Sequence, residues 1–435
     1  MKRLRSLLAA AAYAVTFLWV YATILSPLFS YEGYRLAWPG SLTIVWLMIV
    51  ALWPAPLLPH TLVRPSALIV WWLYLAAYIP SILVPALSLS MPWEKLLPLH
   101  LSLAVSMGLL CLVCSSRLLA IGQMKLSPTV FWSIFTLIWL AGLAFASGTS
   151  SVLTNVGSVL KGATEYEIRG QVQQIVTAGN RVLAYVLGEL GQALNPFLIA
   201  LGIVRRRSLY LAGGIIGQLI VFGVTGFKTV VLSAIFLPLI FLVIRRWRSN
   251  FGLAFASGVI AIMIACAIVD HATGGIFFSS LVTRRTLAGP GLLTGFYFDH
   301  FSQVSHAGIA YHFHRDASVL DASREVGLVY FGSSNVDANA NLWAEGFADL
   351  GVPGILGFTL ITALMIWLYD SIAHRRNLEL AVLLVVMPAV GLSNSAPTTV
   401  LITHGGLVAA MLLYFAPLAP AETAKLEERH APTSD

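Results

Sequence analysis

Charged residues are scarce in this 435-residue chain: Asp, Glu, Lys and Arg together make up 10% of it, whereas hydrophobic residues make up 58%. A water-soluble protein of this length cannot hide so much apolar surface. Cysteine is also rare, and all three cysteines fall inside apolar runs. Cys111 and Cys114 have the spacing of a redox pair or of half a zinc site, but their apolar setting favours small core residues on one helix face.

The apolar residues form continuous stretches of about eighteen or more, the length that an α-helix needs to cross a bilayer. A membrane β-barrel would instead alternate apolar and polar residues over about ten positions per strand. The sequence therefore predicts an all-α, polytopic integral membrane protein. The first run, Leu7 to Phe29, is too long for the core of a signal peptide and is predicted to be a retained helix.

We predict about twelve transmembrane helices from these runs. Their approximate positions are 7–29, 40–58, 66–87, 97–116, 127–147, 182–204, 208–226, 229–244, 251–269, 350–369, 378–396 and 400–418.

The basic residues indicate the orientation, because short cytoplasmic segments of membrane proteins are enriched in Lys and Arg. With a cytoplasmic N-terminus, sixteen of the 26 basic residues fall inside: Lys2, Arg3, Arg5, Arg64, Arg117, Lys125, Arg205, Arg206, Arg207, Arg245, Arg246, Arg248, Arg375, Arg376, Lys425 and Arg429. Both termini are therefore predicted to be cytoplasmic. The net charge of +7 reflects this topology and does not indicate a nucleic-acid partner.

The domain organisation follows from this pattern. Residues 1–269 are predicted to hold the first nine spans with a first periplasmic loop at 148–181, and 270–349 a large periplasmic catalytic loop. Spans ten to twelve lie in 350–420, and 421–435 is a cytoplasmic tail. The large loop combines titratable groups with many aromatic residues, which favours an ordered, functional segment.

Four cationic residues on the outer side are candidates for binding an anionic phosphate: Arg169, Lys228, Arg284 and Arg285. They run against the orientation bias, and Arg binds phosphate oxygens in a bidentate manner. The alternatives are a solvated amphipathic segment around Arg169, a snorkelling lysine at 228, and snorkelling arginines in an aromatic belt at 284 and 285.

Acidic and imidazole groups supply candidates for acid–base chemistry. Asp299 and His300 lie within the aromatic run Tyr297 to Phe301, which is a candidate platform for sugar rings. His312-x-His314 has the spacing of two metal ligands on a strand, but no second pair follows, so no metal is predicted. Glu189, inside the sixth predicted span, is either a functional carboxylate or half of a structural ion pair.

Asn341, Glu345 and Asp349 are spaced by four residues, so on a helix they share one face. We predict that this helix leads into the tenth span, that Glu345 is the catalytic base, and that Asn341 contacts substrate. A carboxylate at a half-desolvated membrane surface can have the raised pKa that a base needs. The alternative is that Glu345 pairs with Arg324 or Arg284 and only holds the loop together.

The layout resembles the Wzy-type oligosaccharide repeat-unit polymerases and, more distantly, the O-antigen ligases. Three stretches carry the resemblance: Thr225-Gly226-Phe227-Lys228, Arg284 to Phe301, and Ala344-Glu345-Gly346-Phe347 followed by Leu350-Gly351-Val352-Pro353-Gly354. The first has lysine where the family usually has arginine. Ligases usually show a His-Asn pair in the last stretch, and Ala340 with Asn341 stands there instead, which favours a polymerase.

The resemblance implies a GT-C-like fold and a glycosyltransferase of the bacterial inner membrane that needs neither metal nor other cofactor. Its donor and acceptor would be glycans on undecaprenyl pyrophosphate, and its partners the chain-length regulator and flippase of the same pathway, besides membrane lipid. A ligase-type transferase is the alternative within this class. A transporter of polysaccharide or lipid-linked sugar is the alternative outside it, and would place charges at the bilayer midplane.

Overall fold

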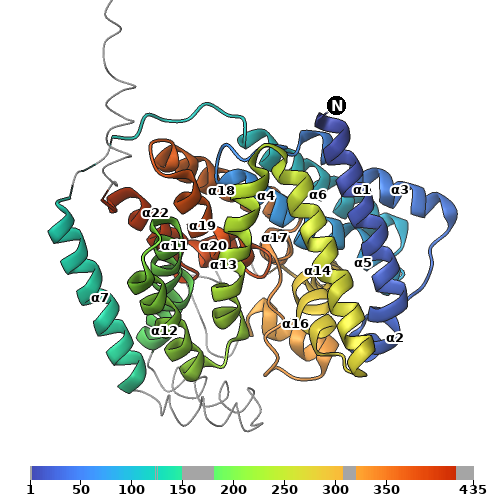
Figure 1. Cartoon of the computed structure of the whole chain (residues 1–435). Helices are drawn as coiled ribbons and strands as arrows, with labels where there is room; N and C mark the ends of the chain where they lie inside the picture. The colour runs from blue at the N-terminus through green and yellow to red at the C-terminus, as the bar shows by residue number, and fades with distance from the viewer. Residues whose placement is uncertain (1, 123, 125, 149–180, 307–319, 418–435) are drawn as a thin grey trace, which may run out of the picture. The chain divides into compact units, whose positions relative to one another are not determined.

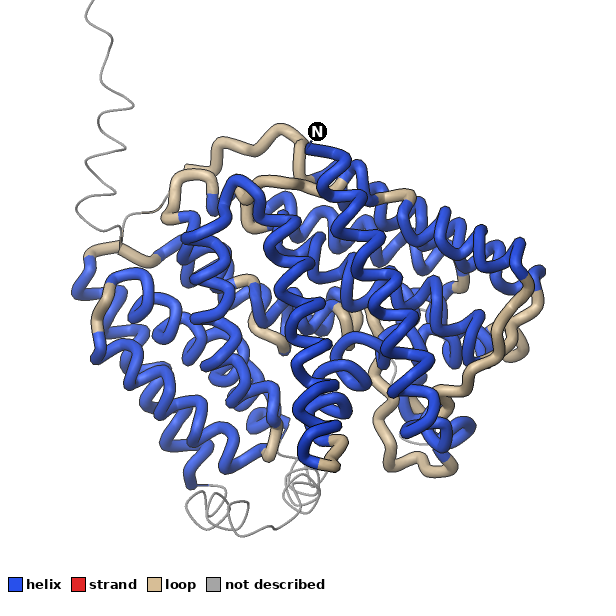
Figure 2. The backbone as a smooth tube through the Cα atoms, turned by 45° about the vertical axis from the view of Figure 1, so that its right-hand side comes forward, coloured by secondary structure: helices blue, strands red, loops and turns tan. Residues whose placement is uncertain are grey.

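The computed structural model describes residues 2–122, 124, 126–148, 181–306 and 320–417. Within these ranges the chain is all helix and loop, without a strand, as Figure 2 shows. The prediction of an all-α protein is therefore confirmed for the part of the chain that is described. Most of the predicted first loop, part of the large loop and the predicted tail lie outside it.

Among the described residues, eight helical runs are long and apolar enough to cross a membrane, or nine if the bent pair α21 and α22 forms one span. The protein is thus a polytopic membrane protein. The count differs from twelve because Ser41–Leu57 and Leu378–Leu392 are shorter apolar helices, and because Lys228–Thr273 forms one long run. That run contains α13 (Lys228–Trp247) and α14 (Phe251–Thr273), joined by a 3-10 turn.

Four segments of π-helix interrupt these helices: η1 (Tyr21–Leu25), η4 (Tyr74–Tyr78), η5 (Leu190–Leu194) and η7 (Ser279–Ala288). A proline stands two residues after the end of each, at Pro27, Pro80, Pro196 and Pro290. Proline lacks an N–H, and its ring collides with the carbonyl four residues earlier in an α-helix. The wider π-turn relieves both problems, since the residue before each proline bonds to the carbonyl five residues back.

The chain folds into two compact units, the first of which comprises Met1–Arg117, Trp247–Trp367 and Ala389–Pro397. Its helices before α14 are α1 (Lys2–Val20), α2 (Ser26–Phe29), α3 (Ser41–Leu52), α4 (Ser66–Leu73), α5 (Ile79–Ser88) and α6 (Trp93–Val113). After α14 come α15 (Gly289–Phe301), α16 (Ala322–Phe331), α17 (Leu342–Leu350) and most of α18 (Val352–Ala373). α1 packs along α14, as Figure 1 shows.

Helix α15 packs closely along α5, although its sequence falls in the predicted loop. Gly291 and Gly295 lie against Pro80 and Pro85, so that the two backbones approach each other. Thr294 Oγ1 lies 2.9 Å from Ser81 Oγ and donates to Pro290 O at 2.7 Å. The sequence of the predicted loop thus folds onto a helix of the run Ser66–Ser88, which is long and apolar enough to cross a membrane.

α17 does not continue straight into α18. Gly351 separates them with φ +66°, a conformation that favours glycine. The backbones of Gly346 and Gly354 then lie in contact, and a Cβ on either would collide with the other's carbonyl. The helix predicted over Asn341 to Asp349 is present, but it folds back against the start of the next span where we expected it to run on.

The second unit comprises Leu118–Arg246, Leu368–Pro388 and Thr398–Asp435. Its helices are α7 (Pro128–Gly148), α10 (Arg181–Glu189), α11 (Asn195–Arg205), α12 (Ser208–Thr225), α13, α19 (Leu378–Leu384), the start of α20 (Val386–Leu392), α21 (Pro397–Thr403) and α22 (Gly406–Phe415). Buried Asn195 and Gln218 hydrogen-bond at 3.2 Å between α11 and α12. Trp139 donates to Asn195 at 2.7 Å, and Gln218 donates to Ser233 at 2.6 Å.

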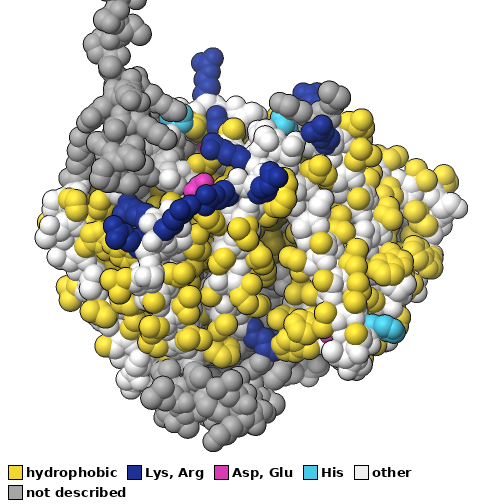
Figure 3. All heavy atoms as spheres, in the orientation of Figure 1, with side chains coloured by type: hydrophobic (Ala, Val, Ile, Leu, Met, Phe, Trp, Pro, Cys, Tyr) yellow, Lys and Arg dark blue, Asp and Glu magenta, His cyan; other side chains and the backbone are white. Residues whose placement is uncertain are grey.

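Large apolar side chains cover much of the exposed surface of the helices, as the yellow atoms in Figure 3 show. Leu42, Leu137 and Leu209 are 88%, 70% and 81% exposed. In water such exposure would be costly, whereas lipid tails are as apolar as leucine. The surface therefore fits a protein embedded in a bilayer.

Candidate active site

The predicted site residues Asp299, His300, Glu345, Asn341, Arg284 and Arg285 all belong to the first unit. Asp299 and His300 end α15, and Glu345 lies on α17, which packs against α15. The structure therefore places the three predicted catalytic side chains on two neighbouring helices.

Asp299 is held by three side chains from three elements. Lys95 Nζ lies 2.7 Å from Oδ1, the Tyr330 hydroxyl donates to Oδ2 at 2.8 Å, and Gln303 Nε2 donates to Oδ1 at 3.3 Å. Burial alone would raise the pKa of Asp299, but these hydrogen bonds and the charge of Lys95 hold that pKa below its usual value. Asp299 therefore stays ionised and is a weak base.

His300 forms a pair with Glu325 of α16, with 2.7 Å between Nε2 and Oε1. The imidazole is largely buried, with 13% of its side chain exposed, and packs edge-on against Phe301. A carboxylate beside an imidazole fixes the orientation of the ring. The pair has the components of a proton-transfer site.

Glu345 is half-buried and accepts a hydrogen bond of 3.2 Å from the Tyr297 hydroxyl, which also lies 3.1 Å from Ala338 O. Burial, followed by the charges of Glu345, Asp321 and Asp349, raises the pKa of Tyr297 well above its usual value. Tyr297 therefore keeps its hydroxyl proton, which it can donate to the Glu345 carboxylate or to Ala338 O. The two arginines that we considered as partners of Glu345 pair elsewhere: Arg284 with Glu32, and Arg324 with Asp337.

Asn341 is fully buried and caps the N-terminus of α17. Its Oδ1 accepts from the backbone N–H groups of Trp343 and Ala344 at 3.0 and 3.2 Å. Its Nδ2 donates to Thr294 Oγ1 at 2.7 Å and to Pro290 O at 3.1 Å. These bonds use the donors and acceptor of the amide, so Asn341 orients the helix that carries Glu345.

Arg284 and Arg285 are adjacent on η7 but lie in different environments. Arg284 is buried and ion-paired with Glu32, it donates to Ser280 Oγ at 2.8 Å, and its Cζ lies 4.8 Å from the Phe29 ring centroid. Burial and the neighbouring Arg285 lower the pKa of Arg284. Arg285 is exposed. About fifteen residues of continuous helix separate the pair from Asp299, a distance of roughly 20 Å.

The other two predicted cations lie elsewhere. Lys228 begins α13 in the second unit, shortly after Gly226, whose φ of +63° ends α12. Arg169 and the His312-x-His314 pair lie outside the described residues. Among the residues that are described, no group of three or more His, Cys, Asp or Glu side chains is placed to hold a metal ion.

The aromatic run on α15 is not an exposed platform. Phe296, Tyr297, Phe298 and Phe301 are 0–4% exposed. Phe296 stacks on Tyr330, and Phe298 on Phe347, with 4.1 Å between ring centroids in each pair. These rings hold α15 against α16 and α17. Because α15 is packed on three sides, it leaves few faces exposed on which a sugar could stack.

The side chains that contact the predicted catalytic groups were not predicted from the sequence: Lys95, Tyr297, Glu325 and Tyr330. Of these four residues, only Lys95 could have been singled out from the sequence. It is a basic residue at the predicted outer end of a span, where the orientation bias disfavours basic residues. Together the described contacts give two acid–base groups, half-buried Glu345 and largely buried His300, beside an ion-paired Asp299.

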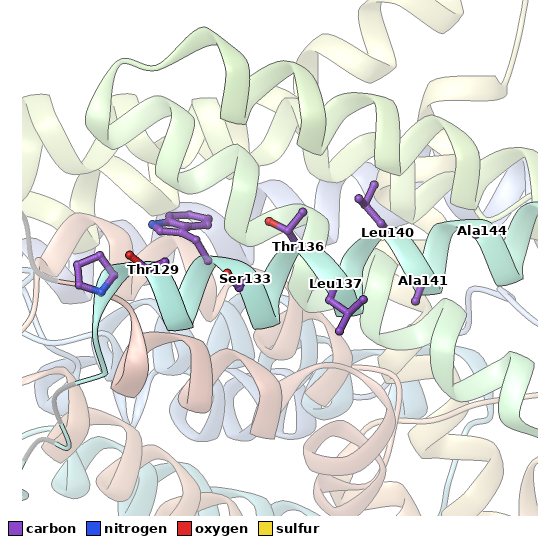
Figure 4. A pocket seen from close by; sticks show the side chains of 9 residues that line it. Thr129, Ser133, Thr136, Leu137, Leu140, Ala141 and Ala144 are labelled. Atoms are coloured by element: carbon purple, nitrogen blue, oxygen red, sulfur yellow. The ribbon is translucent and has the colours of Figure 1, made fainter.

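A shallow groove runs along the surface of α7 in the second unit (Figure 4). All of its lining residues come from that one helix, among them Ser133, Thr136, Leu137 and Leu140. None is titratable, so the groove has the features of a lipid-facing helix surface and not of a reaction site.

Comparisons with known proteins return no match to this chain, whether with family models, curated proteins or solved structures.

Proposed function

We propose that the protein is a polysaccharide polymerase that joins oligosaccharide repeat units carried on undecaprenyl pyrophosphate. The observation that carries the proposal is the placement of Glu345, with its donor Tyr297, beside the His300–Glu325 pair on the packed helices α15, α16 and α17. The resemblance of Arg284 to Phe301 and of Ala344 to Gly354 to the Wzy-type polymerases adds to it.

The proposed reaction is a metal-independent glycosyl transfer. A sugar hydroxyl of the acceptor attacks the anomeric carbon of the donor, Glu345 accepts the hydroxyl proton, and lipid pyrophosphate leaves. The departing group carries negative charge, which a bound cationic side chain would stabilise. Arg285, Lys228 and Arg169 are the proposed cations, and buried Arg284 supports Arg285 through its ion pair with Glu32. Asp299 and His300 are the alternative bases.

The proposed setting is the bacterial inner membrane, with both termini cytoplasmic and the segments around 148–181 and 270–349 on the periplasmic side. The twelve-span, GT-C-like architecture belongs to this proposal: two short apolar helices, Ser41–Leu57 and Leu378–Leu392, would complete the count together with α13, α14 and the bent pair. The chain-length regulator and flippase of the same pathway are the proposed partners.

The glycan pattern of a deletion strain tests the proposal. Loss of a polymerase leaves a single repeat unit on the anchor, whereas loss of a ligase leaves none there and polymer on the carrier lipid. We expect the single-unit pattern. Polymer retained on the carrier lipid would contradict the proposal and favour a ligase.

One observation favours a second candidate, a carrier of lipid-linked sugar. α21 and α22 are bent by 53° at their junction, and broken helices are typical of transporters. In a strain that lacks a flippase, lipid-linked units accumulate on the cytoplasmic face of the membrane. If the protein is a carrier, its deletion should therefore leave lipid-linked units on the cytoplasmic face. If it is a polymerase, the units should accumulate on the periplasmic face.

A further inference from the structure

The junction of α21 and α22 brings an ionisable side chain into a broken apolar helix. α21 ends at Thr403, α22 begins at Gly406, and Gly405 between them has φ +77°. The side chain of His404 lies at this break. Its Nδ1 is buried and has no hydrogen-bond partner among the described residues.

Glu189 lies beside the same break, at the end of α10. The backbone N–H of Gly405, at the N-terminus of α22, faces the Glu189 carboxylate. The other oxygen, Oε2, is buried and has no partner within the described ranges. A charged oxygen without a partner is costly in such a place, so this arrangement needs a reason.

The backbones around the two side chains are in direct contact. A Cβ on Gly188 would lie 2.5 Å from Thr403 O, and one on Gly405 would lie 3.0 Å from the carbonyl carbon of Gln192. The π-segment η5 starts at Leu190, immediately after Glu189. Two segments far apart in the sequence are therefore held together by glycine contacts, with Glu189 and His404 at their meeting point.

Both groups lie inside apolar runs. Glu189 is seven residues from the start of the run Val182–Arg205, and His404 is seven residues from the start of α21. At 1.5 Å per residue, each residue is about 10 Å along the chain axis from the start of its run. An ionisable group within an apolar run is a functional candidate by default.

The surrounding helices offer few other charges. α7 has no titratable residue. The titratable residues on the other elements that pack around η5 are Arg181, Tyr185, Arg205, Tyr210 and Tyr414, with Lys228 at the start of α13. The start of α13 reaches η5, because the Val230 side chain lies against Gly191. In the described part of the chain, no Lys or Arg lies within ion-pair distance of Glu189, so the structural ion pair that we considered for it is absent there.

We propose that Glu189 and His404 form an intramembrane site that binds one proton. In the empty state the carboxylate holds the Gly405 N–H, and His404 is neutral. In the occupied state the added proton lies on Glu189 Oε2 and is donated to the imidazole, which supplies the partner that each buried atom lacks. The net change is one proton and one unit of charge.

Occupancy of this site is linked to the helix break. A carboxylate accepts a backbone N–H more strongly than a neutral carboxyl does, and the N-terminus of α22 favours the negative form. Protonation therefore loosens the attachment of Glu189 to Gly405. The site would give this unit a proton-dependent bend between α21 and α22, independently of any glycosyl transfer.

Labelling with a hydrophobic carbodiimide tests the site, because the reagent modifies protonated carboxyl groups in apolar surroundings. The full-length protein in detergent is labelled from about pH 5 to pH 9, and modified residues are identified by mass spectrometry. We expect modification of Glu189 that falls as pH rises, while exposed Glu94 stays unmodified. Glu189→Gln should abolish labelling at this position.

His404→Ala should shift the labelling midpoint to lower pH by about one unit, because the protonated carboxyl loses its acceptor. Thr403→Val, at the neighbouring position, is the control and should leave the midpoint unchanged. An unlabelled Glu189 at every pH would overturn the proposal, and so would a midpoint that His404→Ala leaves unchanged or raises. Protection of Glu189 by sodium at constant pH would overturn it too, since the site would then hold a metal cation.

Discussion

Asp299 combines partial burial with three hydrogen-bond donors, and its ionised state depends on them. Since its pKa is lower in the folded protein than in the unfolded chain, the carboxylate stabilises the fold above its unfolded pKa of about 3.9. That contribution is lost as pH falls through the lower, folded value. The ion pair with Lys95 is thus expected to hold α6 against α15 at neutral pH and to be lost in acid, when Asp299 becomes protonated.

Lys95→Met should therefore lower the melting temperature most at neutral pH, and the difference from the unmodified protein should shrink below about pH 4. Tyr330→Phe removes one donor and leaves the ion pair, so its effect should be smaller but of the same sign. Thermal unfolding in detergent as a function of pH measures both. A Lys95→Met difference that stays constant down to about pH 3 would show that Asp299 is not the group concerned.

The two arginines of η7 should respond differently to removal. Arg284→Ala leaves Glu32 without its cation and should destabilise the protein, since an ion pair broken on one side costs more than the pair contributes. Arg285→Ala should leave the melting temperature nearly unchanged but shorten the polymer, if exposed Arg285 binds pyrophosphate. Melting curves and glycan ladders of the two variants separate these roles. Normal polymer from Arg285→Ala would remove that residue from the phosphate site.

At the scale of single residues, the sequence indicates candidate groups but not their partners. Glu345 and Asn341 stood out because their spacing of four predicts one helix, and that helix exists. Nothing in the sequence could pair His300 with Glu325 or Glu345 with Tyr297, because these contacts depend on how α15, α16 and α17 pack. Asn341 was interpreted as a substrate ligand, and its polar atoms instead cap α17 and bond to α15.

Among the elements, the π-segments show how a local rule positions functional groups. Each precedes a proline and rotates the side chains before it relative to those after it. η7 carries Arg284 and Arg285, and η5 follows Glu189. The π-turn η5 directly precedes Asn195-Pro196, because the missing N–H of Pro196 affects the preceding turn.

The contact between α17 and α18 should be intolerant of any side chain. Gly354→Ala would place a methyl group against the Gly346 carbonyl and should destabilise the protein by about 1–3 kcal/mol. Gly357→Ala, on the same helix with open space around it, is the matched control and should be neutral or slightly stabilising. Thermal unfolding compares them. Equal stability of the two variants would mean that the helices do not pack as described.

For the whole molecule, hydrophobic runs predicted the membrane class correctly, because that signal is summed over many residues. The number of spans was harder to predict from the sequence. Short apolar helices such as Ser41–Leu57 have the composition of a span without its length. Similarly, α15 has the composition of a loop because Asp299, His300 and three glycines interrupt its apolar pattern, yet it packs along α5.

The orientation of the whole chain is open to a direct test. A reporter inserted after Gly332, an exposed turn with open space around it, should be active only if it functions outside the cytoplasm. The reason is the concentration of basic residues in the short segments assigned to the cytoplasm. A second insertion beside Arg375 should give the opposite result. Cytoplasmic activity at Gly332 would invert the topology and remove the proposed access to periplasmic substrates.

Reconstituted polymerisation tests the central proposal most directly. The purified protein is incubated with undecaprenyl-pyrophosphate-linked repeat units, and the products are separated by size. Glu345→Gln keeps the shape of the side chain and its bond from Tyr297 but cannot accept a proton. We predict a ladder of polymer from the unmodified protein and, from Glu345→Gln, at least a hundredfold slower elongation, of the order that general-base catalysis contributes, with unchanged thermal stability. A normal ladder from Glu345→Gln would exclude Glu345 as the base, and no ladder from the unmodified protein would contradict the polymerase proposal itself.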